Sequence, residues 1–144
     1  MKWTTEARGK VGGGVLLMLL GAGIPALVGA LQGDVGQPYH ETRLYFGTQR
    51  AHGGEIGEKE FTEFLDRAVT PAFPEGLTLQ EGRGQWREAD GDIVREHSYE
   101  LVLLYPEKEA ENRSVHIERI RRAYQTDYDQ DSVGRSDDQV KVDF

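Results

Sequence analysis

Hydrophobic and polar residues alternate where the folded part of this 144-residue chain begins. Leu44 and Phe46 alternate with Arg43 and Tyr45, which is the period-two pattern of a strand with one apolar and one mixed face. The pattern predicts a strand over residues 42–46.

A helix over residues 58–69 is expected next, because apolar side chains recur there at spacings of three and four. Acidic residues near its beginning suit the positive end of the helix dipole. Pro71 restricts Thr70 to extended conformations, so the helix should end there.

Residues 77–87 and 93–105 are predicted to form two strands joined by a tight turn. Asp90-Gly91 between them is a strong hairpin signal, and we expect a type I′ turn in which both residues have positive φ. The almost wholly apolar run at residues 101–105 is typical of a central strand covered on both faces.

The remaining segments complete an α+β domain. A helix is expected over residues 110–128, followed by a strand in which Val140, Val142 and Phe144 alternate with polar residues. The order βαββαβ is that of the ferredoxin-like sandwich, in which a four-stranded antiparallel sheet carries both helices on one face. We expect this fold for residues 41–144, after an N-terminal apolar helix.

The N-terminal part of the chain has the features of an export signal. Basic side chains outnumber acidic ones in residues 1–10, and residues 11–31 carry no charge. Val28-Gly29-Ala30 supplies the small residues that signal peptidase accepts, so cleavage after Ala30 is the first interpretation. The alternative is an uncleaved transmembrane anchor, because about 20 apolar residues span a hydrocarbon layer.

This segment sets the expected organisation of the chain. Residues 1–30 are predicted to be a signal peptide or membrane anchor, residues 31–40 a linker, and residues 41–144 the domain. The basic flank stays inside, so we expect an extracytoplasmic domain, periplasmic or secreted, or anchored through residues 11–31. The membrane would be contacted only through the N-terminal segment.

Composition and charge exclude several classes of function. The absence of cysteine rules out thiolate catalysis and cysteine-bound zinc. The acidic net charge of −8 argues against nucleic acid as a partner, because such binding depends on clustered Lys and Arg. The four histidines are scattered, and hydrolase, phosphate-loop and dinucleotide motifs are missing, so we expect no cofactor and no histidine metal site.

The acidic segment at residues 127–138 has part of a calcium-loop spacing. Aspartates stand at the loop's first, third, fifth and twelfth positions: Asp127, Asp129, Asp131 and Asp138. Ser132 replaces the required glycine, and Arg135 places a cation among the ligand positions. A solvated acidic connection is the favoured interpretation, with no metal.

The mixed face of the first strand suggests a binding site. If the helices cover Leu44 and Phe46, then Arg43 and Tyr45 point to the open face of the sheet. Gly82 and Gly84 indicate a bulge, or a place where the backbone approaches another group closely. The candidate ligand-binding residues on this face and the neighbouring hairpin are Arg43, Tyr45, Gln85, Trp86, Arg87, Glu96 and Ser98.

The same residues could instead serve the packing of the sheet, without any ligand. Arg43 could pair with Glu96 across the sheet while Trp86 packs against an edge.

Five separated blocks of the sequence match a known family. They are ETRLYFG (41–47), VTPAFPEGL (69–77), GRGQWR (82–87), IVRE (93–96) and LVLLYP (101–106). In this order they resemble a bacterial family of small exported proteins, domain of unknown function 3574, over about residues 40–144. The resemblance implies the domain boundary and export, and it implies no activity. Members often carry a lipid-modified cysteine, which this chain lacks, so lipid anchoring is not implied.

Two functions stay open at this point. One is a small binding or interaction module of the cell envelope that uses the open sheet face to hold a small molecule or a protein. Because residues 101–105 offer apolar side chains to both faces, we also expect a homodimer. The other is a cofactorless enzyme of the dimeric ferredoxin-like type, acting on a small molecule near Arg43, Tyr45 and Trp86.

Overall fold

The computed structural model of the chain describes residues 35–144. The predicted apolar helix, the cleavage site after Ala30 and the first part of the predicted linker lie outside these residues. Within the described part, no helix is long and apolar enough to cross a membrane.

The described chain folds in the order βαββαβ. Its elements are β1 (Gln37–Gly47), α2 (Glu58–Phe64) continued by a π-helical turn (Leu65–Val69), β2 (Thr78–Arg87), β3 (Ile93–Pro106), a 3₁₀ turn (Glu107–Glu109), α3 (Ala110–Tyr128) and β4 (Gly134–Val142).

The first strand begins earlier than the sequence suggested. β1 starts at Gln37, inside the segment that the sequence assigned to a linker. Pro38 is tolerated because it pairs only with Lys141 of β4, and pairing with β3 begins one residue later at Tyr39. A proline at a position with one neighbouring strand removes no hydrogen bond on its open side.

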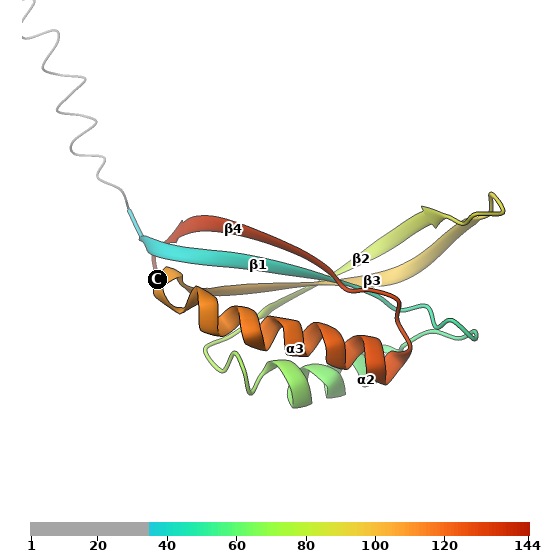
Figure 1. Cartoon of the computed structure of the whole chain (residues 1–144), viewed down its shortest axis with the longest axis horizontal. Coiled ribbons are helices and arrows are strands. Elements are labelled where there is room, and N and C mark those ends of the chain that lie inside the picture. The colour runs from blue at the N-terminus through green and yellow to red at the C-terminus, as the bar shows by residue number, and fades with distance from the viewer. Residues whose placement is uncertain (1–34) are drawn as a thin grey trace, which may run out of the picture. The chain divides into compact units, whose positions relative to one another are not determined.

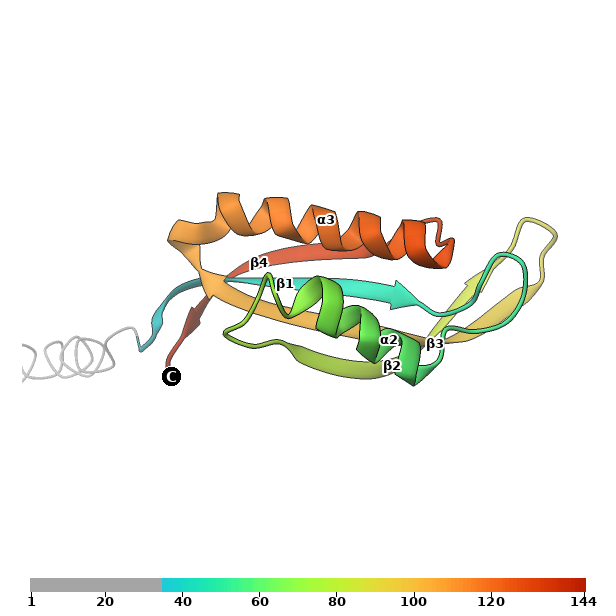
Figure 2. The same cartoon turned by 90° about the horizontal axis from the view of Figure 1, so that it is seen from below.

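The four strands form one antiparallel sheet in the order β2-β3-β1-β4. Both helices lie against the same face of this sheet, and the other face carries no layer from residues 35–144 (Figures 1 and 2). The ferredoxin-like fold predicted from the sequence is therefore confirmed.

Alternate residues of the two central strands fill the space between sheet and helices. Leu44 and Phe46 of β1 and Leu101 and Leu103 of β3 are fully or almost fully buried there. They meet an aromatic cluster in which the Phe46 ring packs edge-on against Tyr124, with ring centroids 4.7 Å apart. This packing decides which residues of β1 and β3 are left for the uncovered face.

Within the described chain, β3 is covered by the helices on one face only. Its helix-facing residues are buried, whereas Ser98, Glu100, Val102 and Leu104 on the other face are half-buried. No other element of residues 35–144 lies over them (Figure 1). The apolar run at 101–105 thus reflects a strand with one fully covered face and one partly covered face.

The turn between β2 and β3 also differs from the prediction. The antiparallel hairpin is present, but only Gly91 has positive φ (99°), and Asp90 does not. Glu88 accepts a bond from the Gly91 amide (3.0 Å) and donates one to Asp92 (2.9 Å). This is a longer loop with a type I turn and a left-handed glycine, which requires positive φ at one residue instead of two.

The distal parts of β2 and β3 project beyond the helices as an arm (Figure 1). We call residues 82–98 the hairpin arm. Because side chains alternate along a strand, one face of this arm continues the open face of the sheet and the other faces the side that carries the helices.

Candidate functional site

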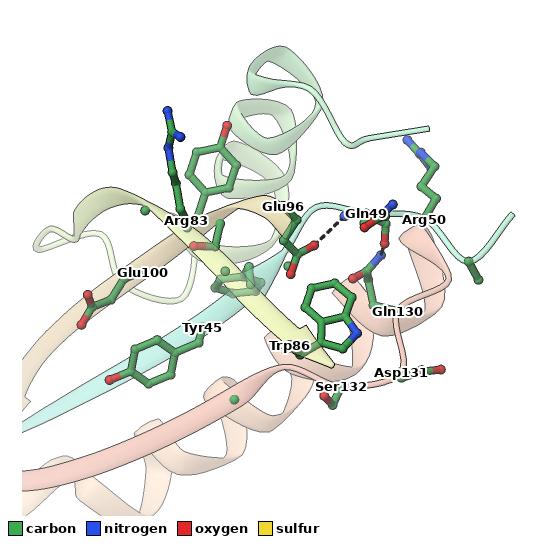
Figure 3. Close-up of a pocket in the computed structure, with 18 of the residues that line it drawn as sticks. Tyr45, Gln49, Arg50, Arg83, Trp86, Glu96, Glu100, Gln130, Asp131 and Ser132 are labelled. Atoms are coloured by element: carbon green, nitrogen blue, oxygen red, sulfur yellow. Dashed lines mark hydrogen bonds between the residues drawn. The ribbon is translucent and has the colours of Figure 1, made fainter. Parts of the chain in front are cut away.

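A cleft of about 840 Å³ lies on the open face of the sheet, where the hairpin arm meets the end of β1 and the connection before β4. Figure 3 shows the side chains around it, with Tyr45 on one side and Trp86 on the other. The cleft is open to solvent. Its position at the strand ends brings together residues that are far apart in the chain.

The floor of the cleft is a row of positions with almost no side chain. Ser98 of β3 pairs with Gly82 of β2 on one side and with Gly47 of β1 on the other. One step along the arm, Gly84 pairs with Glu96. Gly82 leaves a low backbone surface beside the small hydroxyl of Ser98, whereas the Glu96 side chain lies against Gly47 and Gly84.

Glu96 is held over this floor by the backbone of the next loop. Its Oε2 accepts hydrogen bonds from the amides of Thr48 and Gln49, both at 2.8 Å. A Cβ on Gly47 would lie 2.6 Å from Oε1 of Glu96, so only glycine leaves room for the carboxylate. Within the part of the chain that the structure describes, Oε1 has no hydrogen-bond partner and can accept one from a ligand.

Two exposed aromatic side chains stand beside the floor. Tyr45 is 45% exposed and Trp86 is 41% exposed. The Tyr45 ring lies over Gly134 of β4, where a Cβ would be 3.2 Å from Cδ2, and its hydroxyl is 3.3 Å from Oγ of Ser136. These rings offer flat apolar surfaces to a ligand on the floor.

The lining of the cleft is mainly acidic. It includes the acidic residues Glu81, Glu88, Glu96, Glu100, Asp129 and Asp131 and the basic residues Arg50 and Arg83; of these, Glu81 and Arg83 occupy β2 positions whose side chains point to the opposite face of the arm. Arg50 is engaged by Glu60, at 2.6 Å between Nη2 and Oε1. The excess of carboxylates favours neutral or cationic ligands over anions.

Four of the candidate residues predicted from the sequence come together in this cleft: Tyr45, Trp86, Glu96 and Ser98. Arg43 lies on the same face but borders a neighbouring hollow. It pairs with Glu41 (2.6 Å) and Glu100 (2.9 Å) instead of with Glu96. The cross-strand pair considered as the structural alternative is therefore absent between these two described residues.

Gln85 and Arg87 do not face the cleft. They alternate with Trp86 along β2 and so point to the opposite face of the hairpin arm. The candidate set had drawn residues from both faces of one strand, because the sequence does not show which residues of this segment lie on the open face.

Sequence reasoning missed the residues that shape the floor and its far end. Gly47, Gly134, Gln49 and Gln130 were not among the candidates, although all four line the cleft. The available signal was the presence of glycine inside strand patterns, which marks close approach of another group. For Gly47 that group is the carboxylate of Glu96, and for Gly134 it is the ring of Tyr45.

No group of three or more His, Asp or Glu side chains in residues 35–144 is arranged to hold a metal ion. The segment with calcium-loop spacing is divided between elements, because Asp127 lies in α3 and Asp138 in β4. Asp127 pairs with Arg67 at 2.5 Å.

Fold and cleft together define an α+β domain of the ferredoxin-like class with an open hollow on its uncovered face. Residues 41–144 match the model of the family described as "Protein of unknown function (DUF3574)", and the chain belongs to that family. The family resemblance noted from the sequence blocks is confirmed. Among curated proteins, none matches the chain.

Two solved structures have a similar fold. A phage SAM lyase in complex with S-methyl-5′-thioadenosine matches with a TM-score of 0.57 at 12% identity, covering 76% of this chain and 94% of that one. A phage SAM lyase in the apo state matches with a TM-score of 0.53 at 10% identity, covering 77% and 95%. At these identities the likeness concerns the fold alone.

Proposed function

We propose that this protein is a small-molecule binding module whose ligand lies in the cleft on the open sheet face. One observation carries the proposal: Gly82 and Ser98 form a low floor, bordered by the Glu96 carboxylate over Gly47, between the exposed rings of Tyr45 and Trp86. A flat ring system can lie on such a floor with apolar contacts to the aromatic side chains.

The polar groups of the cleft narrow the class of ligand. Oε1 of Glu96 accepts a hydrogen bond from the ligand, and the surrounding carboxylates disfavour negative charge. We therefore propose a flat, neutral or cationic heterocycle that carries an N–H or O–H donor. Purine nucleosides are suitable first probes, because a phage SAM lyase of similar fold was solved with S-methyl-5′-thioadenosine.

Tryptophan fluorescence of the full chain tests the proposal. Trp3 and Trp86 are its two tryptophans, so a ligand-dependent signal that disappears in Trp86→Phe comes from the cleft. The probes are adenosine, S-methyl-5′-thioadenosine and nicotinamide. We expect saturable quenching by at least one, weakened about tenfold in Tyr45→Ala, which keeps the Trp86 reporter, since stacking on one aromatic ring contributes about 1–3 kcal/mol.

A substitution on the floor provides the matched comparison. Gly82→Val places a branched side chain on the flat surface and should abolish the response. Arg119→Gln, on the exposed side of α3, should leave it unchanged. Absence of saturable quenching with all three probes, or equal binding by Gly82→Val and the unmodified chain, would overturn the proposal.

A cofactorless enzyme acting on a small molecule is the second candidate. What favours it is Oε1 of Glu96, which lies against Gly47 and Gly84 without a hydrogen-bond partner in the described chain and could accept a proton from a bound substrate. Incubation with the ligand found by fluorescence, followed by mass spectrometry, tests it. Conversion that is lost in Glu96→Gln while binding persists would establish the enzyme, and an unchanged ligand mass would exclude it for that ligand.

We also propose that the protein is exported and that it forms a homodimer. Export rests on the basic residues before the uncharged segment 11–31. The dimer would cover Val102 and Leu104, which are half-buried on the open face at the end away from the cleft. The intact mass of the protein recovered outside the cytoplasm tests export, and a cytoplasmic chain retaining Met1 would refute it. Sedimentation at micromolar concentration tests the dimer, and a monomer would refute it.

A further inference from the structure

The face of the hairpin arm opposite the cleft carries three arginines. Arg83 and Arg87 lie on β2, and Arg95 lies on β3. They alternate with Trp86 and Glu96, so their side chains leave the sheet on the other side. Figure 3 shows the Arg83 side chain pointing away from Trp86. All three residues are exposed.

These arginines are without partners among residues 35–144. None of the three forms an ion pair or a side-chain hydrogen bond there, a property shared only with Arg119 and Arg122 on α3. The other described arginines each bind at least one carboxylate: Arg43, Arg50, Arg67, Arg113, Arg121 and Arg135. In a chain of net charge −8, a cluster of unpaired cations is a distinct local feature.

The strand register places the three arginines at neighbouring positions of the arm. Arg83 pairs with His97, Gln85 with Arg95, and Arg87 with Ile93. Arg95 is therefore the diagonal neighbour of both other arginines, at the roughly 7–8 Å separation of such positions. Like charges at this spacing repel one another, and a bound anion would offset that repulsion.

A hollow of about 760 Å³ lies beside this cluster, between the arm and the loop that follows β1. Arg83, Arg95, Gln85 and His97 are among the residues that line it. Nε2 of His97 is shielded from solvent and has no hydrogen-bond partner within the described chain. Oε2 of Glu81 lies 3.6 Å from it, which is beyond hydrogen-bond range.

The two carboxylates that line the hollow are already engaged by other donors. Oε1 of Glu55 accepts from Oγ1 of Thr48 at 2.8 Å and from the His97 amide at 3.3 Å. Glu96 accepts from the two loop amides described above. Neither carboxylate binds Arg83 or Arg95, so the guanidiniums keep their hydrogen-bonding capacity for a ligand.

We propose that this hollow binds an oxyanion group, phosphate or carboxylate, through Arg83 and Arg95. The planar guanidinium matches both groups, since its parallel N–H donors bind two oxygens at once. The amide of Gln85 supplies a further donor, and Nε2 of His97 supplies another in the tautomer or charge state that carries a proton there. This site goes beyond the proposed function, because it lies on the opposite face of the arm and takes a ligand of opposite charge.

Titration of the full chain with inorganic phosphate and with citrate tests the site, by calorimetry and by amide NMR. We expect saturable binding of at least one probe, with shifts of the Gln85, Arg95 and His97 amides. Arg83→Gln and Arg95→Gln should each weaken binding about tenfold or more, the effect of losing a charge-assisted contact. Arg119→Gln removes an equally exposed and unpaired cation elsewhere and should change the affinity less than about twofold.

Each result of these titrations has a distinct meaning for the proposal. Stronger binding of phosphate or of citrate identifies which oxyanion the site prefers. No saturable binding of either probe, or an Arg119→Gln effect as large as that of Arg83→Gln, overturns the proposal. Trp86→Ala should leave anion binding unchanged, so failure of the cleft proposal and failure of this one are distinguishable.

Discussion

The hydroxyl of Tyr124 on α3 donates a hydrogen bond of 2.7 Å to the carbonyl oxygen of Gly47 at the end of β1. Burial raises the pKa of Tyr124, so the phenol stays protonated and continues to donate. On the opposite side of the sheet, the carboxylate of Glu96 rests over the same glycine. Gly47 is thus fixed from the core and from the cleft at once.

Removing the hydroxyl should loosen this arrangement. Tyr124→Phe is expected to lower the free energy of unfolding by about 1 kcal/mol, because a buried donor to a backbone carbonyl is lost. Urea denaturation measures the change. Tyr45→Phe is the matched control, since its hydroxyl is exposed, and it should change stability by less than about 0.5 kcal/mol. Equal effects of the two variants would contradict a role for the Tyr124 bond.

Adding one methyl group to Gly47 should displace Glu96. In Gly47→Ala the new Cβ would lie 2.6 Å from Oε1, so the carboxylate must move and release the amides of Thr48 and Gln49. We expect a loss of about 1–3 kcal/mol of stability. Gly82→Ala is the control, because its Cβ would meet only Oγ of Ser98, at 3.1 Å, and a hydroxyl can rotate away. A smaller loss in Gly47→Ala than in Gly82→Ala would refute the explanation.

A cluster of ion pairs on the helix side of β4 should make the domain less stable at acidic pH. Arg135 lies 2.9 Å from Glu118 and 2.9 Å from Asp137. Burial acts to raise the pKa of both carboxyls, but hydrogen bonds outweigh this effect and hold both pKa values below their ordinary ranges. Arg121 and Arg135 donate to Glu118. Arg135 and Thr42 donate to Asp137.

The sign of the pH dependence follows from these lowered values. A carboxyl whose pKa is lower in the folded state than in the unfolded state raises the free energy of unfolding at neutral pH. This stabilisation is lost as the pH falls below about 4 and through the folded-state pKa values. Arg135→Gln should therefore make stability less dependent on pH in acid, as measured by urea denaturation over a pH series. Arg119→Gln should keep the original slope. An unchanged slope in Arg135→Gln would exclude this cluster as the cause.

Substitutions in the turn between β2 and β3 should distinguish a type I turn with a left-handed glycine from a type I′ turn. Gly91→Ala should cost about 1–2 kcal/mol, because φ of 99° at this residue is unfavourable for a side chain. Asp90→Gly should not stabilise the hairpin, since Asp90 has negative φ and its Oδ1 accepts from the Asp92 amide at 3.0 Å. A gain in stability from Asp90→Gly in urea denaturation would instead favour the type I′ turn expected from the sequence.

Apolar periodicity was sufficient to predict most of the fold. The apolar spacing across residues 110–128 predicted α3 with the bounds that the structure has. β4 was predicted only in part, because it begins at Gly134 with polar residues. Two of these, Arg135 and Asp137, satisfy each other on the helix side of an edge strand, where hydrophobic alternation is not required.

The site was harder to predict because it depends on strand register and on backbone groups. Tyr45, Trp86, Glu96 and Ser98 were correctly expected on one face, but the partners of Glu96 are amides, which no side-chain pattern reveals. The pairing of Arg43 with Glu100 depends on how β1 aligns with β3. A shift by one residue would have exchanged the two faces, and the sequence alone does not fix that alignment.

The chain enters the domain beside the point where it leaves the sheet, since Gln37 pairs with Val142. The cleft lies at the other end of β1, an 11-residue strand that spans roughly 33 Å at ~3.3 Å per residue. Gln37, where β1 begins, is thus separated from the proposed ligand cleft by the length of that strand. Attachment at that end of the strand is accordingly the orientation of choice for surface-based affinity measurements.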